Sequence, residues 1–569
     1  MSSYKDSDHF DTNLAYQRRK HSPRCLIITG VIVTIVVIAA VVVGVVFAVL
    51  PHTATSVVTA ATPPMGWNTW NRFKCSFTEN IVRETVNRML ELRLVRLGYN
   101  HIVLDECWQY KRNSSGHIQP DPLRLPNGAT GMKTLADYLN SRGLKLGLST
   151  SVGTLTCFRR PGSYSKETID AATYKSWSVD YVKSADCFTH PGTYSYNNYI
   201  AMSRALRQTN QNIAFSVGPT ISAQGAKDIA IARQVGNDNV DDFDLMLSIV
   251  DRLVEEGLAR EAGTGFWNDL GMLQVGNGKM STSEYRIHMS LWSALKSPLF
   301  LGNDLRTMSQ AVEDIIQNSD IIAINQDPLG ISANLIYSEI PFDGISKVQI
   351  VSKMCASTTF SQNFLFDSLR KRIHYYPDSS KCLTMETTYR YVTLRSCKND
   401  TIDVNQQWFI NTQTGTIHQE NNRGNCITTS TIARSPAKVR SCNERNNTAE
   451  YIGPNEWWHP FNDVFYFDGD LTASFSIRNT NNMCASLGAV DDIQIYSGPL
   501  SNNNRVAILL NRDVTERSIT LRWQDMGVSP GQQYQTRDVW TKSYAGDYKQ
   551  TYSASVKPHD LVMLYMRAV

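Results

Sequence analysis

The sequence predicts an α/β protein with a parallel, helix-covered sheet that follows a single N-terminal transmembrane helix. Two observations predict this: a long apolar segment lies near the N-terminus, and short apolar runs then alternate with helical patterns between residues 62 and 330. Strand–helix alternation of this length suits a closed (β/α)8 barrel, whose active sites form at the C-terminal ends of the strands. A doubly wound open sheet has the same periodicity, so periodicity alone leaves both arrangements open.

The composition fits a folded chain of several domains. The 569 residues exceed one ordinary domain, and 42% of them are hydrophobic while 19% are charged. The formal net charge is only +4, and much of the basic character lies near the N-terminus. We therefore expect no nucleic-acid partner. The composition leaves the oligomeric state open.

The apolar segment at residues 26–50 is long enough to cross a bilayer. A helix rises about 1.5 Å per residue, so this run spans a hydrocarbon core of about 30 Å. Its β-branched residues still form a helix in lipid, because the backbone there has no other hydrogen-bond partners. The alternative is a cleaved signal peptide, whose apolar stretch has only about 7–15 residues. The greater length and the polar leader before it favour an uncleaved anchor.

The charges around this segment predict its orientation. Residues 51–62 after it contain no Lys or Arg, whereas four basic residues precede it. These are Arg18, Arg19, Lys20 and Arg24. The positive-inside rule then places the tail (1–25) in the cytosol, and the stem (51–62) and all that follows outside the cell or in a lumen. We expect a single-pass type II membrane protein of the cell surface or secretory pathway.

Cysteines and glycosylation sequons agree with an oxidising compartment. Of the 11 cysteines, Cys25 lies at the cytosolic membrane edge, and the other ten form an even set suited to disulfides. Sequons for N-glycosylation at Asn113, Asn399 and Asn446 lie on the same side as those ten. The histidines are scattered, so we expect no metal site, and no cofactor is implied.

Within the alternating region, short apolar runs predict strands and periodic segments predict helices. We expect strands at residues 101–108, 144–152, 179–187, 213–217, 265–272, 298–301 and 321–325. We expect helices at residues 132–142, 167–177, 196–209, 245–259, 283–296 and 310–317.

Motifs in this region make the expectation specific. Residues 62–73 read Thr-Pro-Pro-Met-Gly-Trp-Asn-Thr-Trp-Asn-Arg-Phe, and residues 105–108 read Asp-Glu-Cys-Trp. Further motifs follow in order at residues 181–187, 266–269, 297–304 and 321–330. Together they resemble glycoside hydrolase family 27, the α-galactosidases and α-N-acetylgalactosaminidases. The resemblance implies a (β/α)8 barrel at residues 63–330 and an activity toward galactose-containing glycans or glycoconjugates.

A retaining α-galactosidase needs a carboxylate nucleophile and a carboxyl acid/base about 5–5.5 Å apart. The family nucleophile lies in Tyr-Leu-Lys-Tyr-Asp-Asn-Cys, whereas residues 181–187 read Tyr-Val-Lys-Ser-Ala-Asp-Cys. Ala185 therefore stands at the nucleophile position, and Asp186 follows it. A methyl group cannot form a glycosyl ester. Since successive strand residues point to opposite faces, Asp186 inherits the role only if the backbone bends at the strand end.

The acid/base position is also changed. In the family it stands four residues after an Arg that Arg233 matches, and here Asn237 occupies it, with Asp238 next. An amide neither gives nor accepts a proton near neutral pH. Both catalytic positions therefore carry inert side chains, each followed by an aspartate.

The resemblance implies further sugar-contacting residues, each with a structural alternative such as packing or ion pairing. The positions that match, or nearly match, are Trp70, Asp105, Glu106, Lys183, Arg233 and Met272. At Glu106 a longer carboxylate replaces the family's Asp. Three other contact positions differ from the family and hold Ser149, Gly218 and Gly271.

After the barrel the sequence departs from the family and then returns to it. Residues 489–569 resemble its C-terminal antiparallel β-sandwich, and residues 331–354 are expected to link to this domain or supply its first strands. Residues 355–488 are an insertion with two cysteine-paired units, each ending in a Gln-x-Trp-like sequence, which resemble ricin-type β-trefoil lectin repeats. A third repeat is degenerate or missing. Thr384 and Thr428 replace a usual ligand Asp, which favours a structural or protein-binding lobe over a sugar-binding one.

The two resemblances imply five disulfides. The expected pairs are Cys75–Cys107, Cys157–Cys187, Cys382–Cys397, Cys426–Cys442 and Cys355–Cys484.

Two functions are compatible with these residues. The displaced acids favour a membrane-anchored, catalytically impaired family member that acts as a glycan- or protein-binding ectodomain. The alternative is an active retaining α-galactosidase that cleaves terminal α-D-galactosides with Asp186 and Asp238.

Overall fold

The computed structural model describes residues 60–236, 241–339, 493–513 and 515–569, and shorter segments in between. These segments are residues 349–354, 363–375, 378–385, 392–398, 403–410, 417–428, 438–441, 466–468, 475–478 and 483–488. Among all these residues, no helix combines the length and apolar character needed to cross a membrane. The predicted tail and anchor, and the predicted stem up to residue 59, lie outside the described residues, as do Asn237 and Asp238.

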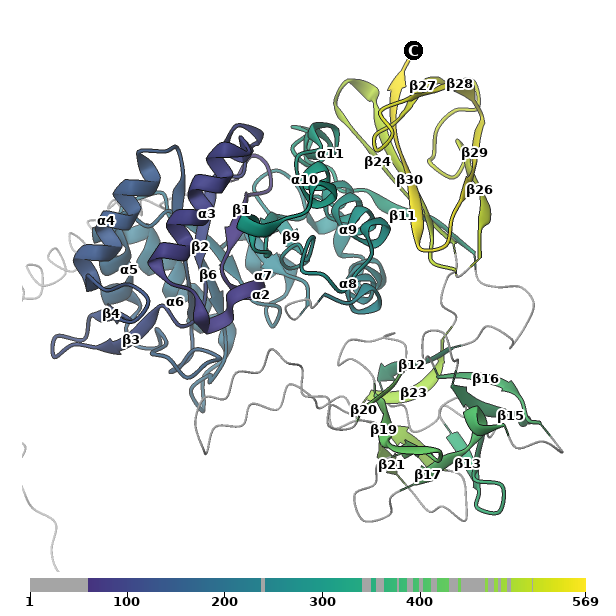
Figure 1. Ribbon diagram of the computed structural model, residues 1–569. Coiled ribbons are helices and arrows are strands. Elements are labelled where there is room, and N and C mark those ends of the chain that lie inside the picture. The colour runs from purple at the N-terminus through teal and green to yellow at the C-terminus, as the bar shows by residue number, and fades with distance from the viewer. Residues whose placement is uncertain are drawn as a thin grey trace, which may run out of the picture. The chain divides into compact units, whose positions relative to one another are not determined.

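An eight-stranded parallel sheet forms the first domain (Figure 1). Its strands, in spatial order, are β10 (Leu299–Leu301), β1 (Met65–Asn68), β2 (His101–Leu104), β5 (Lys145–Ser151), β6 (Tyr181–Ala185), β7 (Ala214–Val217), β8 (Ala232–Gln234) and β9 (Trp267–Asp269). A parallel bridge between Leu273, just after β9, and Leu301 of β10 joins the two ends of the sheet. The arrangement is therefore a TIM-like barrel and not an open doubly wound sheet.

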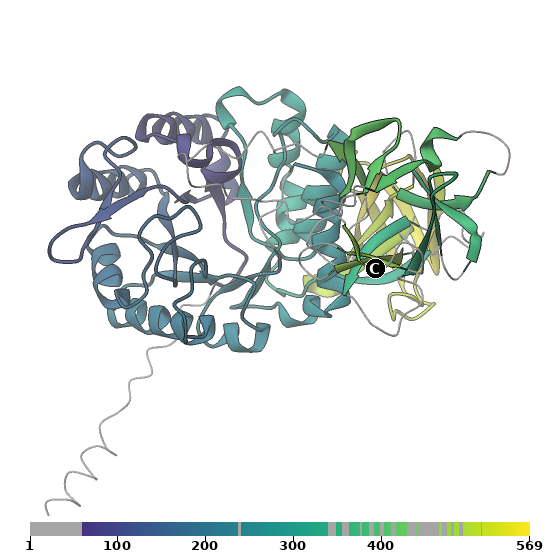
Figure 2. The same ribbon diagram turned by 90° about the horizontal axis from the view of Figure 1, so that it is seen from below.

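Helices connect the strands and cover the outside of the barrel (Figures 1 and 2). They are α3 (Glu79–Glu91), α4 (Gly128–Asn140), α5 (Glu167–Ser176), α6 (Ser195–Gln208), α7 (Ala223–Lys227), α8 (Phe243–Glu255), α9 (Thr282–Ala294), α10 (Gln310–Ile316) and α11 (Ser319–Asn325). Local sequence sets several of their starts. Ser281, for example, begins α9 with a capping box closed by Glu284.

One predicted strand is wrong. Residues 321–325 belong to α11, because the Asn318 side chain accepts hydrogen bonds from the backbone of Asp320 and Ile321 and so caps a helix. Isoleucine-rich runs favour strands by propensity, but burial of Ile321 and Ile324, three residues apart, stabilises the helix here. A strand that the prediction lacked is β8, which is too short to show as an apolar run.

The barrel interior is filled by side chains. Val103, Tyr181, Trp267 and Phe300 form part of one buried cluster. Gly147 is required beside them, because a Cβ there would lie 2.9 Å from Val103 Cγ2 and 3.2 Å from Tyr181 Cδ1. The barrel is thus a packed core, and polar chemistry is confined to the C-terminal ends of the strands, which we call the mouth.

The C-terminal domain is an antiparallel β-sandwich, as the resemblance implies. One sheet has the order β11 (Asn334–Glu339), β24 (Ile493–Pro499), β25 (Arg505–Asn511), β30 (Asp560–Ala568), β27 (Gln533–Asp538) and β28 (Tyr544–Lys549). The other pairs β26 (Arg517–Arg522) with β29 (Thr551–Val556). Ile495, Leu509, Leu521 and Trp523 pack between them. Part of the predicted link, β11, therefore belongs to this domain.

The inserted lobe contains two similar four-stranded meanders. The first is β13 (Asn363–Asp367), β14 (Arg372–Tyr375), β15 (Asp378–Met385) and β16 (Val392–Ser396); the second is β17 (Trp408–Ile410), β18 (Ile417–Gln419), β19 (Asn422–Thr428) and β20 (Lys438–Ser441). Their registers correspond: His374 pairs with Cys382 in the first, and His418 with Cys426 in the second. The repeat seen in the sequence is thus also a repeat of strand pairing.

A third set of strands joins the two ends of the insertion. Its order is β21 (Tyr466–Asp468), β22 (Phe475–Arg478), β23 (Met483–Gly488) and β12 (Gln349–Met354). Residues 349–354, at the end of the predicted link, therefore pair with strands of the lobe, because β12 is bonded to β23 and β16. The strands of this set thus come from both ends of the insertion.

A buried histidine in α9 predicts loss of stability in acid. His288 is fully buried, its ring lies 4.1 Å from that of Trp292, and burial lowers its pKa to about 3. Between that pKa and the usual value near 6.5 the unfolded chain binds the extra proton, so stability rises with pH through this window. Lowering the pH from 6.5 to 5 should cost about 2 kcal/mol through this group alone.

The measurement is urea denaturation at pH 6.5 and 5 of the protein and of His288→Leu. The variant should lose about 2 kcal/mol less over this interval. Replacement of the exposed His190 by Leu is the control and should keep the full pH dependence. Equal pH dependence in His288→Leu and the parent would contradict the assignment.

Candidate active site at the barrel mouth

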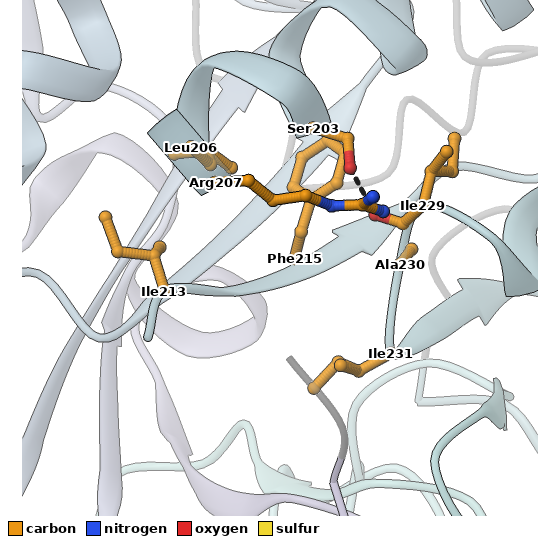
Figure 3. Close-up of a pocket in the computed structure, with 8 residues that line it drawn as sticks. All are labelled: Ser203, Leu206, Arg207, Ile213, Phe215, Ile229, Ala230 and Ile231. Atoms are coloured by element: carbon orange, nitrogen blue, oxygen red, sulfur yellow. Dashed lines mark hydrogen bonds between the residues drawn. The ribbon is translucent and has the colours of Figure 1, made fainter. Parts of the chain in front are cut away.

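A pocket lies between α6 and the segments that lead into β7 and β8 (Figure 3). Its lining consists of Ser203, Leu206, Arg207, Ile213, Phe215, Ile229, Ala230 and Ile231. These residues come from α6 and from the N-terminal ends of β7 and β8. None of the eight carries a carboxyl or imidazole group, and the Ser203 hydroxyl is bonded to the Ile229 carbonyl at 2.7 Å. Glycosidase chemistry has no acid to use there, so the candidate site remains at the mouth.

The family nucleophile position lies at the end of β6 and faces the mouth. Lys183 is in register with Ser149 of β5, and Ala185 is in register with Ser151. Tyr181 lies two residues before Lys183 and belongs to the interior cluster, so Lys183 and Ala185 share the inward face of β6. Ala185 therefore presents a methyl group on this face, at the position that the sequence resemblance aligns with the family nucleophile.

The carboxylate of Asp186 makes its contacts with the next strand loop and with the helix layer. It accepts a hydrogen bond from Thr220 Oγ1. The Tyr199 hydroxyl, from α6, lies close by, donates to the Ser184 carbonyl at 3.3 Å and accepts from Gly218 N at 3.1 Å. Burial, and then the nearby Asp186 charge, raise the pKa of Tyr199. The displaced aspartate is thus engaged on the side of β6 that carries Tyr199.

Arg233 supports the loop after β7. Its Nε donates to the Ile221 carbonyl at 2.5 Å and its Nη2 to the Pro219 carbonyl at 3.3 Å. Burial lowers its pKa, and Nη1 has no hydrogen-bond partner among the described residues. The predicted acid/base residues, Asn237 and Asp238, follow β8 but lie outside the described residues. The structure therefore describes Arg233, but not the acid/base position four residues after it.

Asp105 is the centre of a polar network at the mouth. Asn68 Nδ2 donates to its Oδ2 at 2.7 Å, the Glu106 backbone N donates to its Oδ1 at 2.8 Å, and Lys183 Nζ lies 3.9 Å from Oδ2. Its own N–H donates to Thr69 Oγ1 at 3.0 Å. The network brings β1, β2 and β6 together, and within it Asp105 and Lys183 form an ion pair.

Glu106 holds a loop of the rim. Its two carboxylate oxygens accept hydrogen bonds from the backbone N–H groups of Cys157 and Phe158, each at 3.0 Å. Burial raises its pKa to about 7, although these bonds and Thr156 favour the ionised form. A disulfide from Cys157 to Cys187 ties the same loop to the end of β6. Both oxygens predicted to contact sugar are thus engaged by the protein itself.

Other side chains of the protein also contact Trp70. Its ring centroid lies 4.6 Å from that of Phe158 in an edge-on arrangement, and Lys74 Nζ lies 4.7 Å from the ring. Trp70 is 7% exposed and Met272 is 4% exposed, and both belong to the interior cluster against which Phe158 packs. These two predicted sugar contacts therefore lie together but beneath other side chains.

Two of the changed family positions have structural roles. The Ser149 carbonyl accepts from the Trp108 and Gln109 side chains, each at 2.8 Å. Gly271 adopts φ +91°, donates to Asp269 Oδ1 at 2.8 Å, and accepts from Trp292 Nε1 at 2.7 Å. A left-handed backbone of this kind favours glycine, so this position serves a turn.

Three of the five expected disulfides are present: Cys75–Cys107, Cys157–Cys187 and Cys382–Cys397. Cys426 is also disulfide-bonded, but its expected partner, Cys442, lies outside the described residues, as does Cys355. The backbone of Cys484 is described within β23, but its side chain is not. His374 lies beside the Cys382–Cys397 bond, and these cysteines cannot act as metal-binding thiolates while they are joined.

In the inserted lobe, Thr384 contributes to packing. It is 7% exposed, it accepts a hydrogen bond from Gln406 Nε2 at 3.1 Å, and Trp408 Nε1 donates to the neighbouring Leu383 carbonyl at 3.0 Å. The side chains of Gln406 and Trp408 thus hydrogen-bond to β15 of the same repeat. Thr428 lies in β19, but its side chain is not described.

Sequence reasoning missed the groups that close the mouth. Phe158 and Thr220 match no catalytic motif, and Tyr199 reads as an ordinary residue of an amphipathic helix. A weak signal was available for Phe158, because each cysteine of the Cys157–Cys187 disulfide is followed by a phenylalanine. Only the structure shows that Phe158 packs on Trp70, whereas Phe188 is 41% exposed.

Comparison with known proteins gives consistent matches. Residues 62–327 match a family described as "Alpha galactosidase A", and residues 490–566 match the "Alpha galactosidase C-terminal beta sandwich domain". The chain is 42% identical over 282 residues to the α-galactosidase of Cyamopsis tetragonoloba, covering 49% of this chain and 67% of that one. It is 36% identical over 322 residues to human α-N-acetylgalactosaminidase, covering 53% and 77%.

Solved structures agree at the level of fold. α-Galactosidase I from Mortierella vinacea aligns with a TM-score of 0.59 at 24% identity, covering 89% of this chain and 97% of that one. The sequence matches span about two thirds of the curated relatives, for example 66% of the Oryza sativa α-galactosidase. The similarity thus covers the barrel in sequence and extends to both family domains.

The contact between Gly218 and Tyr199 predicts a coupled effect on stability. An added Cβ at Gly218 would lie 2.6 Å from the Tyr199 hydroxyl, which is fully buried and cannot easily move. We expect Gly218→Ala to cost about 1–3 kcal/mol in urea denaturation. Tyr199→Phe removes the clashing oxygen, so the double variant should lose clearly less than the sum of the single variants. Additivity within about 0.5 kcal/mol would contradict the predicted clash.

Proposed function

Because this chain belongs to glycoside hydrolase family 27, the α-galactosidase family, we propose that it is a membrane-anchored, non-hydrolysing member whose barrel serves as a binding ectodomain. The observation that carries the proposal is Ala185 on the inward face of β6, beside Lys183. Retention requires a carboxylate that attacks the anomeric carbon, and an alanine at this point supplies none. Fold alone does not secure the family's chemistry, because the activity depends on the side chains of the site.

The displaced aspartate does not restore that chemistry. Asp186 follows the last residue of β6, is bonded to Thr220 in the loop after β7, and lies near Tyr199. To attack a sugar in the mouth, its carboxylate would have to leave that hydrogen bond and the strand end would have to turn. Asn237 at the acid/base position adds a second inert side chain. Loss of the nucleophile alone costs several orders of magnitude in rate.

Binding is the function that these residues can still support. Asp105, Lys183 and Trp70 keep the chemistry that recognises hydroxyls and the apolar faces of a sugar. We propose galactose-containing glycans as the first ligand class and a protein as the second. Binding to a glycan array separates the two.

The inserted lobe would extend this binding surface. We propose that its three four-stranded sets form a β-trefoil of the ricin type. The buried Thr384, which is engaged by Gln406, supports a structural or protein-binding role for the first repeat. The apolar segment at 26–50 would anchor the whole chain as a type II protein, with the barrel outside the cell or in a lumen.

Incubation with an aryl α-galactoside tests the lost chemistry. The full-length chain, purified in a detergent without a sugar headgroup, should show no turnover above a buffer blank. Asp186→Asn should then be indistinguishable from the parent, because the carboxylate is not part of a reaction. Turnover that Asp186→Asn abolishes would show that the displaced acid is catalytic and would overturn the proposal.

Membrane fractionation tests the anchor. The full-length chain should stay in the membrane pellet after alkaline carbonate extraction, because residues 26–50 span the bilayer. The exposed Asn113 should carry a glycan that a peptide N-glycosidase removes, and Asn113→Gln should lose the same mass. Release into the supernatant would refute the anchor, and an unmodified Asn113 in the intact cell would contradict the orientation.

A further inference from the structure

We infer that Phe158 determines access to the barrel mouth. Held in place by Glu106, it covers Trp70, so that a pyranose can bind there only when the rim loop at residues 155–161 moves away. The inference takes from the proposed function only the choice of a galactose-type ligand. It concerns binding, and it holds whether or not a bound sugar is cleaved.

Two side chains, Phe158 and Lys74, already contact the Trp70 ring. An indole ring binds a pyranose through its open face, against which the sugar packs its C–H groups. Here Phe158 lies 4.6 Å from the Trp70 ring centroid at an interplanar angle of 70°, and the Lys74 ammonium lies 4.7 Å from the same ring. With only 7% of Trp70 exposed, a sugar cannot reach the ring without displacing one of them.

The rim loop is compact and is held by its own hydrogen bonds and by contacts with its neighbours. A bridge between Leu155 and Pro161 closes its base, and Thr156 N donates to the Arg160 carbonyl at 2.8 Å inside it. Cys157 is joined to Cys187, so the disulfide fixes one side of the loop. Phe158 follows directly, and its position depends on what holds its own backbone.

Glu106 is the positioning residue that holds this backbone. Its carboxylate accepts from Cys157 N and Phe158 N, each at 3.0 Å, and so aims the Phe158 side chain at Trp70. The family motif has Asp at this position, which is one methylene shorter. Shortening the side chain by about 1.5 Å would bring both contacts beyond hydrogen-bond distance. The glutamate therefore supplies the reach that closes the mouth.

The test measures binding of free galactose to the full-length chain, in a detergent without a sugar headgroup, by titration calorimetry. Galactose contains no glycosidic bond to another sugar, so hydrolysis cannot contribute to the signal. Phe158→Ala should bind galactose at least tenfold more tightly than the parent, because the face of Trp70 becomes available. The control is Tyr194→Ala, which removes an aromatic ring that is 77% exposed and should not change binding.

A second variant separates the effect of the Phe158 side chain from a general loss of structure. Glu106→Asp keeps the charge but not the reach, so it should also gain galactose affinity. Its circular dichroism should stay that of the folded parent, although its thermal stability should fall because a buried carboxylate loses two hydrogen bonds. Parent binding as tight as that of Phe158→Ala would overturn the inference. Failure of both folded variants to gain affinity would overturn it as well. Failure of the proposed function would appear separately, as turnover of the aryl galactoside.

Discussion

The alternation of side chains along β6 is the constraint on which the function of this protein depends. A parallel strand presents every second residue to the barrel interior, and hydrogen bonds to β5 and β7 fix that register. Lys183 and Ala185 consequently share one face, while Asp186 contacts Thr220 and lies beside Tyr199. Ala185 thus presents a methyl group on the face that it shares with Lys183.

The rest of the mouth is stabilised by its own contacts. Asp105 is held by Asn68 and Lys183, Arg233 by the carbonyls after β7, and Glu106 by the rim loop. Groups that would otherwise hydrogen-bond a sugar are thereby satisfied within the protein, which removes the cost of burying them without partners. These residues therefore stabilise the folded barrel, and this role does not depend on a reaction.

Sequence reasoning reached most of the fold, because repeating strand–helix units and family motifs are distributed along the whole barrel. It failed where local pattern and tertiary structure disagree. Residues 321–325 look like a strand until the Asn318 cap and burial on one helical face are seen, and β8 is too short to show periodicity. In the candidate site, motif alignment identified Ala185 and Glu106 as departures from the family. It could not find Phe158, since packing across two loops leaves no regular spacing in the sequence.

The pairing of β12 with β23 explains how a lobe of this size fits inside another domain. The first and last strands of the inserted lobe run side by side, so the chain enters and leaves the lobe at neighbouring points. The flanking strands β11 and β24 can therefore remain hydrogen-bonded partners, as though a short turn joined them. Such a module adds surface without disturbing the register of its host sheet, and it can be gained, lost or exchanged while the host domain keeps its fold.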